Sequence, residues 1–134
     1  MKVVDHGMEV LLDTHTLIWW MVDPARLSKE AAAILADTGS RILVSAVVAW
    51  ELAIKINAGK IQPSSLLLGL DGAFAKQTFA ELPISLEHAV KAGLLPLHHR
   101  DPFDRLLVSQ ALVLGIPIVS ADRTLDAYGV RRIW

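Results

Sequence analysis

Four carboxylates occupy positions in the sequence where an isolated charge is hard to explain. Glu51 is the only ionisable residue in the apolar stretch ILVSAVVAWELAI, residues 42–54. A carboxylate in such surroundings is rarely buried without a partner, because removing its charge from water is costly. Asp13 ends the apolar run EVLL, Asp122 follows the apolar run PIVS by one residue, and Asp104 lies in the first turn of a predicted helix.

These carboxylates predict a divalent metal site if the fold brings them together. Several carboxylates within a few ångströms repel one another and would have to bind protons unless a cation compensated their charge. Oxygen ligands and the absence of cysteine favour Mg²⁺ or Mn²⁺ over zinc. A metal ion of this kind activates water for attack on a phosphodiester, so the predicted chemistry is hydrolytic phosphoryl transfer.

Each acid also has a structural explanation. Aspartate is a preferred helix N-cap, so Asp13 and Asp122 could cap the helices that follow their strands. Glu51 and Lys55 are spaced i,i+4 in the favourable orientation for an ion pair. Asp101 is better explained as the N-cap of the helix that follows it. One shared site accounts for the four carboxylates together, whereas the structural explanation needs a separate cause for each.

The order of strands and helices indicates an α/β fold. Short apolar runs alternate with longer stretches of helical period, which is typical of parallel strands joined by crossover helices. Strands are predicted at 9–13, 41–45, 81–84, 117–120 and 130–134, and helices at 15–21, 27–37, 46–57, 85–93 and 102–114, with a weaker helical period at 64–79. The strands at 81–84 and 130–134 are expected at the sheet edges. In a parallel sheet the carboxyl ends of the strands share one edge, and the four acids are expected there.

Other polar residues near the acids are expected to support the site. Thr14 and Ser120 flank acids in the sequence and, with Asp101, could orient the carboxylates or the waters on a metal ion. Three cations close to the acids could contact a phosphate backbone, with solvent exposure as the alternative for each: Lys55, Arg105 and Arg123.

Histidine and tryptophan residues receive mainly structural interpretations. The segment 98–100, HHR, precedes the 102–114 helix and is predicted to be a solvated loop rather than a phosphate contact. Trp50 could stack on a nucleic acid base, although core or interface packing is the commoner role. Trp19 and Trp20 make the first helix apolar nearly all round, so this helix is expected to pack on its own sheet and on a second surface.

Composition limits the class of protein. The 134 residues carry a formal net charge of −1 and are 53% hydrophobic, which suits one domain with a core that needs no disulfide or structural metal. The absence of cysteine excludes thiolate zinc sites, iron–sulfur clusters and cysteine nucleophiles. The near-neutral charge argues against a broad basic surface for nucleic acid, so a polyanion would have to be bound locally.

The apolar excess does not indicate a membrane protein. No run reaches the roughly 18 apolar residues that a spanning helix requires. Residues 9–22 lack the basic start and the cleavage site of a signal peptide, so we expect no membrane association and a cytoplasmic location. The excess instead predicts that another copy or a partner covers part of the surface, because large exposed apolar patches are uncommon on monomers.

In four segments the chain resembles the PIN-domain nucleases, specifically the VapC-type toxins of bacterial toxin–antitoxin modules. The segments, in order, read LLDTHTLIWW, VSAVVAWELAIKINAGK, LPLHHRDPFDRLLVSQAL and IVSADRTLDAYGVRRIW. The resemblance covers residues 9–134 as a single PIN domain and leaves residues 1–8 as a short extension without an assigned role. It implies a three-layer α/β/α fold with a central, mainly parallel sheet, and an acidic pocket that binds Mg²⁺ or Mn²⁺ and cleaves RNA.

The resemblance also assigns individual residues and partners. The four acids that it makes catalytic metal ligands are, in chain order, Asp13, Glu51, Asp104 and Asp122. Ser120 matches the Ser or Thr that the family has shortly before its fourth acid. The family further implies a homodimer, a small cognate antitoxin whose tail lies across the acidic groove, and an RNA substrate, which in characterised relatives is often transfer RNA.

Other α/β enzymes fit the sequence less well. A phosphatase of the haloacid-dehalogenase type needs a second acid two residues after the first, and that position is His15. A dinucleotide-binding domain would carry G-x-G-x-x-G after the first strand, which is absent. A receiver domain would need paired acids early in the chain. The remaining alternative is a non-catalytic PIN-like interaction module, against which the intact set of acids argues.

Overall fold

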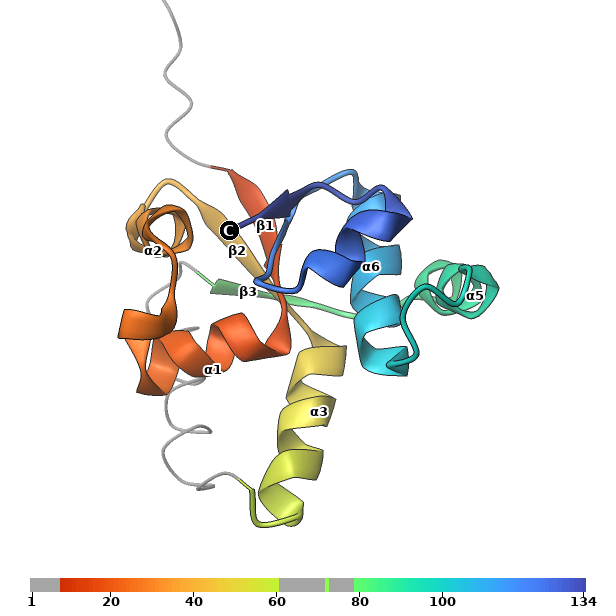
Figure 1. Ribbon diagram of the computed structural model, residues 1–134, viewed down its shortest axis with the longest axis horizontal. Coiled ribbons are helices and arrows are strands. Elements are labelled where there is room, and N and C mark those ends of the chain that lie inside the picture. The colour runs from red at the N-terminus through yellow and green to blue at the C-terminus, as the bar shows by residue number, and fades with distance from the viewer. Residues whose placement is uncertain (1–7, 61–71, 73–78) are drawn as a thin grey trace, which may run out of the picture.

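A parallel β-sheet of five strands forms the centre of the protein (Figure 1). The computed structural model describes residues 8–60, 72 and 79–134. The strand order is β3-β2-β1-β4-β5, and all four neighbouring pairs are parallel. The strands are β1 Glu9–Leu12, β2 Arg41–Ser45, β3 Phe79–Leu82, β4 Ile118–Val119 and β5 Arg132–Ile133. β1 is therefore the central strand, and β3 and β5 form the edges as predicted.

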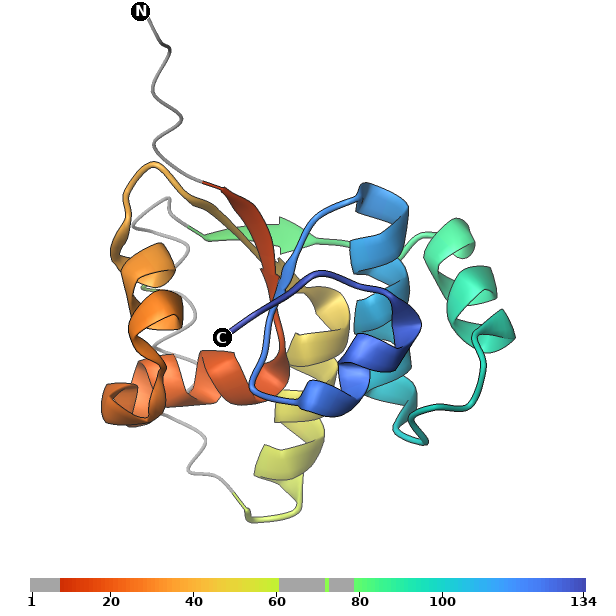
Figure 2. The same ribbon diagram turned by 45° about the horizontal axis from the view of Figure 1, so that its top comes forward.

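Helices lie on both sides of the sheet, which confirms the predicted three-layer α/β/α fold. They are α1 Thr14–Val22, α2 Lys29–Ala36, α3 Ala46–Asn57, α5 Leu86–Leu94 and α6 Pro102–Leu114, with 3₁₀ turns at Pro24–Arg26 and Arg123–Tyr128. Figures 1 and 2 place α1 and α2 on one side of the strands and α6 on the other, with α5 packed outside α6. Among the described helices, none has both the length and the hydropathy needed to cross a bilayer.

Helix ends follow local signals in the sequence. The Ser45 hydroxyl accepts a hydrogen bond from the N–H of Val47, which makes Ser45 the N-cap of α3. The helix begins at Ala46, as predicted. Asp101 caps α6, and Gly115 closes that helix in the left-handed conformation at φ 68°. These signals act over a few residues, so the bounds of α3 and α6 agree with the prediction.

The third strand is displaced from its predicted position. Residues 81–84 were expected to form it, but β3 runs from Phe79 to Leu82 and pairs with β2. Pro83 has no N–H to donate to a neighbouring strand, so the strand ends before it. The helical period predicted for residues 64–79 lies almost wholly outside the described residues, and its last residue, Phe79, begins β3.

The chain itself covers part of the apolar first helix, α1. The ring of Trp20 lies 4.8 Å from that of Phe79, and the ring of Trp19 lies 5.7 Å from that of Trp134, between ring centroids. The guanidinium of Arg26 lies over the ring of Trp19, 4.8 Å from the ring centroid. The expectation that this helix packs on a second surface beyond its own sheet stays a prediction, because Trp19, Trp20 and Met21 remain partly exposed and Val22 is 54% exposed.

Leu11 lies at the centre of the core and provides a test of the packing. It is fully buried in β1 and faces Leu43 and Ile118 in the register of the two neighbouring strands. We expect Leu11→Ala to lower the free energy of unfolding by about 2–5 kcal/mol, from lost burial and a cavity. Urea denaturation measures this, with the exposed Leu97→Ala as a control expected to change stability by about 0.5 kcal/mol or less.

Candidate active site

The carboxyl ends of β1, β2 and β4 lie at one edge of the sheet, because these strands are parallel neighbours. Asp13 follows β1 directly, and its backbone N–H donates to the carbonyl of Val119 at the end of β4 (3.2 Å). The hydroxyl of Thr16 donates to the same carbonyl (3.0 Å). These two hydrogen bonds fix the start of α1 against β4, and so place Asp13 beside the segment that leads to Asp122.

Asp13 and Glu51 are buried on neighbouring helices. Asp13 is 5% exposed, and one of its carboxylate oxygens accepts from the N–H of Thr16 (2.8 Å), which makes it the N-cap of α1. Glu51 is 8% exposed; its Oε1 accepts from the Thr14 hydroxyl (2.6 Å), and its Oε2 lies 3.7 Å from Lys55 Nζ. The cap and the ion pair that offered structural explanations are both present, yet within the described residues each carboxylate still has an oxygen not held by an N–H or O–H donor.

The other two predicted acids, Asp104 and Asp122, meet at a histidine. His99 Nε2 lies 3.0 Å from Asp122 Oδ2 and 3.3 Å from Asp104 Oδ2. One ligand atom from each of these three residues lies within 4.8 Å of the others, a spacing compatible with a metal site. The prediction of a solvated loop for the segment 98–100 is wrong for His99, because the histidine fills the space between two carboxylates that the sequence alone could not place. His98 and Arg100 are exposed, as expected of that loop.

The charges at this edge act on Asp104. Burial raises the pKa of Asp104, and the neighbouring carboxylate of Asp101 raises it further. His99 lowers it in part, while Asp13 and Glu51 raise it, and the resulting pKa is about 7. The carboxylates of Asp101, Asp13 and Glu51 therefore lie near enough for their charges to oppose ionisation of Asp104.

At Asp122 the influences that lower the pKa outweigh those that raise it. Partial burial raises its pKa, but the hydrogen bonds from the hydroxyl and N–H of Thr124 and the contact with His99 outweigh burial. The pKa of Asp122 is consequently below its ordinary value, and the group stays ionised at neutral pH. Asp122 is also the N-cap of the 3₁₀ turn that follows it, so its structural role and its place in the cluster coexist.

The supporting residues predicted from the sequence occupy several positions around the cluster. Asp101 caps α6 by accepting from Phe103 N–H (2.9 Å). The Ser120 hydroxyl accepts from the N–H of Asp122 (3.0 Å), which fixes the backbone that carries this acid. Arg105 donates from Nη1 to the carbonyls of His99 (3.2 Å) and Arg100 (3.0 Å), so this guanidinium holds the loop before α6.

The residues present fit a divalent cation. Four carboxylates belong to this edge, and carboxylate oxygens are the ligands that Mg²⁺ and Mn²⁺ prefer. Burial, together with the charges of Asp101, Asp13 and Glu51, raises the pKa of Asp104 to about 7. A cation would relieve this repulsion. Asp104 and Asp122 form the tight group with His99, and Asp13 and Glu51 lie on the β1 and α3 side of it.

A substitution at Thr14 tests the hydrogen bond that its hydroxyl donates to Glu51. Thr14→Val keeps the shape of the side chain and removes the hydroxyl that donates to Oε1, leaving a buried carboxylate with one donor fewer. We expect the free energy of unfolding of the metal-free protein to fall by about 1–3 kcal/mol. Chemical denaturation in EDTA measures the change, and Thr14→Ser, which keeps a hydroxyl, should recover most of it. Equal stability of the Val and Ser variants would show that this hydrogen bond contributes nothing.

Comparison with known proteins identifies the family of this chain. Residues 10–130 match the PIN domain. The chain is 31% identical over 120 residues to Ribonuclease VapC22 of Mycobacterium tuberculosis, an alignment that covers 89% of this chain and 91% of that protein. The fold of this chain is similar to that of a DNA-bound VapBC structure from Salmonella typhimurium, with a TM-score of 0.72 and 19% identity. The match covers 94% of this chain and 97% of that one.

A second solved structure gives the same result. VapBC2 from Rickettsia felis, bound to a DNA fragment from its promoter, matches with a TM-score of 0.70 at 15% identity, covering 94% of this chain and 98% of that one. At identities this low the two solved structures show the fold alone. The PIN-domain match, by contrast, spans residues 10–130, and the VapC22 alignment covers 89% of the chain. The chain therefore belongs to the PIN-domain family.

Proposed function

We propose that this protein is a metal-dependent endoribonuclease, the toxin component of a VapC-type toxin–antitoxin pair. The observation that carries the proposal is the gathering of acids at one sheet edge, where burial and repulsion raise the pKa of Asp104 to about 7. A family relative named a ribonuclease supports the same chemistry. The substrate would be RNA, with transfer RNA as one candidate, and the cofactor Mg²⁺ or Mn²⁺.

The proposed ligands are the four carboxylates Asp13, Glu51, Asp104 and Asp122. When bound, the ion supplies a nucleophilic water at neutral pH and stabilises the charge that develops on the phosphodiester. The chain's own residues orient the ligands: Thr16 N–H fixes Asp13, the Thr14 hydroxyl fixes Glu51 Oε1, and Thr124 fixes Asp122 Oδ1. Fixed ligands of this kind reduce the reorganisation needed at the moment of reaction.

Phosphate contacts would come from a small number of local cations. Lys55 lies 3.7 Å from Glu51 and is partly exposed, and Arg123 is exposed directly after Asp122. We propose both as contacts to the RNA backbone. Arg105 is the weakest of the three predicted contacts, because its Nη1 already donates to two loop carbonyls.

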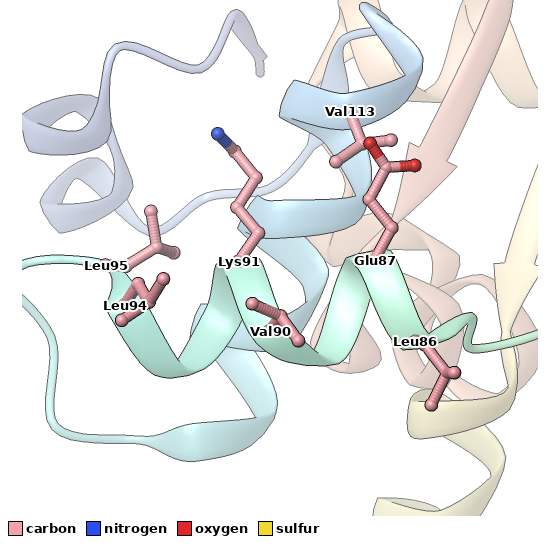
Figure 3. Close-up of a pocket in the computed structure, with 7 residues that line it drawn as sticks. All are labelled: Leu86, Glu87, Val90, Lys91, Leu94, Leu95 and Val113. Carbon is pink, nitrogen blue, oxygen red and sulfur yellow. The ribbon is translucent and has the colours of Figure 1, made fainter.

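A homodimer is also part of the proposal, with α5 rather than α1 as its surface. Leu86, Val90 and Leu94 are spaced four residues apart on α5 and form one exposed apolar stripe, with exposures of 87%, 61% and 80%. A pocket of about 690 Å³ runs along this helix. Figure 3 shows the residues that line it: Leu86, Glu87, Val90, Lys91, Leu94, Leu95 and Val113. Such a stripe is what the apolar excess in the sequence predicts for a partnered surface.

The dimer surface is tested by Leu94→Glu. We expect light scattering to give a dimer for the parent at micromolar concentration and a monomer for the variant, because a charge in the stripe would be desolvated on association. Ile54→Glu, an exposed apolar position on α3, serves as the matched control and should leave the dimer intact. A monomeric parent would refute the homodimer, and a dimeric Leu94→Glu variant would exclude α5 as its surface.

RNA cleavage by the purified protein, freed of any antitoxin, tests the proposed activity. Labelled structured RNA should be cut in Mg²⁺ or Mn²⁺, stay intact in EDTA, and be cut again when excess metal is restored. A cognate antitoxin, supplied as the product of a neighbouring small reading frame, should suppress cleavage. Cleavage that persists in EDTA would exclude the metal mechanism, and no cleavage of any RNA with metal present would favour the non-catalytic interaction module.

A further inference from the structure

His99 is the residue at the acidic edge that the proposed activity leaves unexplained. Its side chain is 19% exposed, and its Nε2 lies between Asp122 Oδ2 at 3.0 Å and Asp104 Oδ2 at 3.3 Å. A histidine beside two acids could be a metal ligand or a hydrogen-bond donor to the acids. The two roles require different atoms to carry the ring hydrogen.

The other ring nitrogen decides between these roles. The backbone N–H of Asp101 donates to His99 Nδ1 at 3.1 Å, so Nδ1 acts as an acceptor and carries no hydrogen. In the neutral ring the hydrogen is then on Nε2, which points at the carboxylates. A metal ion at Nε2 would require the ring hydrogen to move to Nδ1, which would break the hydrogen bond from Asp101 N–H because both groups would then be donors. The hydrogen-bond pattern therefore makes Nε2 a donor.

The backbone of His99 is also held on both sides. Its N–H donates to the Tyr128 hydroxyl oxygen (2.8 Å), and its carbonyl accepts from Arg105 Nη1 (3.2 Å). Tyr128 belongs to the turn that Asp122 caps, and Arg105 belongs to α6, which carries Asp104. The two elements that carry the acids therefore also anchor the histidine between them.

We propose that His99 is a positioning residue that bridges Asp104 and Asp122 through its Nε2–H and is not itself a metal ligand. A single donor between two like charges offsets their repulsion and holds the carboxylates close together before metal binds. The role rests on the proposed function, since it assumes that these two acids are ligands. Donors that orient ligating groups commonly affect metal affinity as strongly as they affect activity.

Two substitutions separate the bridge from the anchoring of the loop. In His99→Gln the amide NH₂ reaches the position of Nε2 and can still donate to the carboxylates. In His99→Asn the shorter side chain can accept from Asp101 N–H in place of Nδ1 but does not reach the acids. We expect Mn²⁺ affinity, measured by calorimetry, to fall by about tenfold or more in His99→Asn, and to be largely retained in His99→Gln. His98→Asn, at the exposed neighbour, should bind Mn²⁺ as the parent does.

Imidazole ¹⁵N spectra of the metal-free protein give a readout independent of activity. The chain has five histidines, and the signal missing in His99→Gln identifies His99. The expected pattern has hydrogen on Nε2 and none on Nδ1, and Mg²⁺ should leave the Nε2 hydrogen in place. Hydrogen on Nδ1, loss of the Nε2 hydrogen when Mg²⁺ binds, or unchanged or tighter Mn²⁺ binding by His99→Asn would each overturn the proposal.

The same measurements distinguish this inference from the proposed function. A protein that binds Mn²⁺ and shows the expected His99 spectrum and variant affinities, but cuts no RNA, would refute the ribonuclease and retain the role of His99. A protein that cuts RNA, while His99→Asn binds Mn²⁺ like the parent, would refute the role of His99 alone. A parent protein that binds no Mn²⁺ would refute both.

Discussion

Asp13→Asn should abolish most RNA cleavage without unfolding the protein. The amide keeps an oxygen that accepts from Thr16 N–H, and asparagine is as good an N-cap as aspartate, so α1 should remain in place. The substitution removes the negative charge that would bind the metal. Metal ions contribute several kcal/mol to such reactions, so we expect the rate to fall by about 100-fold or more.

The control for this prediction is an aspartate outside the acidic edge. Asp37 is exposed at the end of α2 and accepts from Gly39 N–H, so Asp37→Asn is the same chemical change at a remote site. It should cleave RNA at the parental rate. Full activity in Asp13→Asn, or an equal loss in Asp37→Asn, would contradict the assignment of Asp13 as a ligand. Thermal melting of all three proteins confirms that any loss is not unfolding.

Asp104→Asn should make the metal-free protein more stable while it removes activity. In the folded protein the pKa of Asp104 is raised to about 7 by burial and by neighbouring carboxylates, above the value of 3.8 for the unfolded chain. The stabilisation from the protonated group is therefore fully present below about pH 4 and is lost as pH rises to about 7. Asparagine has no such charge, so its advantage should grow across this range.

The stability that Asp104→Asn should gain follows from the raised pKa of Asp104. Moving a pKa from 3.8 to about 7 corresponds to about 4 kcal/mol, and screening at a side chain that is 22% exposed reduces this to about 1–2 kcal/mol. Urea denaturation in EDTA at pH 5 and pH 8 measures the free energy of unfolding of the parent and of Asp104→Asn. We expect the variant to be the more stable of the two at pH 8. Mg²⁺ should then stabilise the parent more than the variant. A variant less stable than the parent at pH 8 would make Asp104 chiefly a structural residue of α6.

Much of the fold was predictable because its signals are local. Ser45 and the pair Asp101-Pro102 mark helix starts by hydrogen bonds and backbone restraints that span only a few residues. The position of β3 depended instead on pairing with β2, a contact between distant segments, and the prediction was displaced by two residues. The partner of Trp19 is Trp134, at the far end of the chain, which no local pattern could indicate.

In the candidate site, too, residues with local signals were predicted, whereas a residue defined by contacts in the fold was missed. The acids were found because Glu51 lies in an apolar stretch and the others follow strands or begin a helix, and parallel topology brings such positions to one edge. His99 was missed because its role depends on three contacts made in the fold, with Asp101, Asp104 and Asp122. Its position directly before a helix that carries an acid was the available signal.

Anomalous scattering from Mn²⁺ in crystals of the protein tests the central claim most directly. We predict a single cluster of anomalous density at the carboxyl edge of the sheet, bound by carboxylate oxygens from Asp13, Glu51, Asp104 and Asp122, which Asp13→Asn weakens or removes. Density elsewhere, or no density at this edge in crystals saturated with Mn²⁺ at neutral pH, would contradict the metal-dependent site.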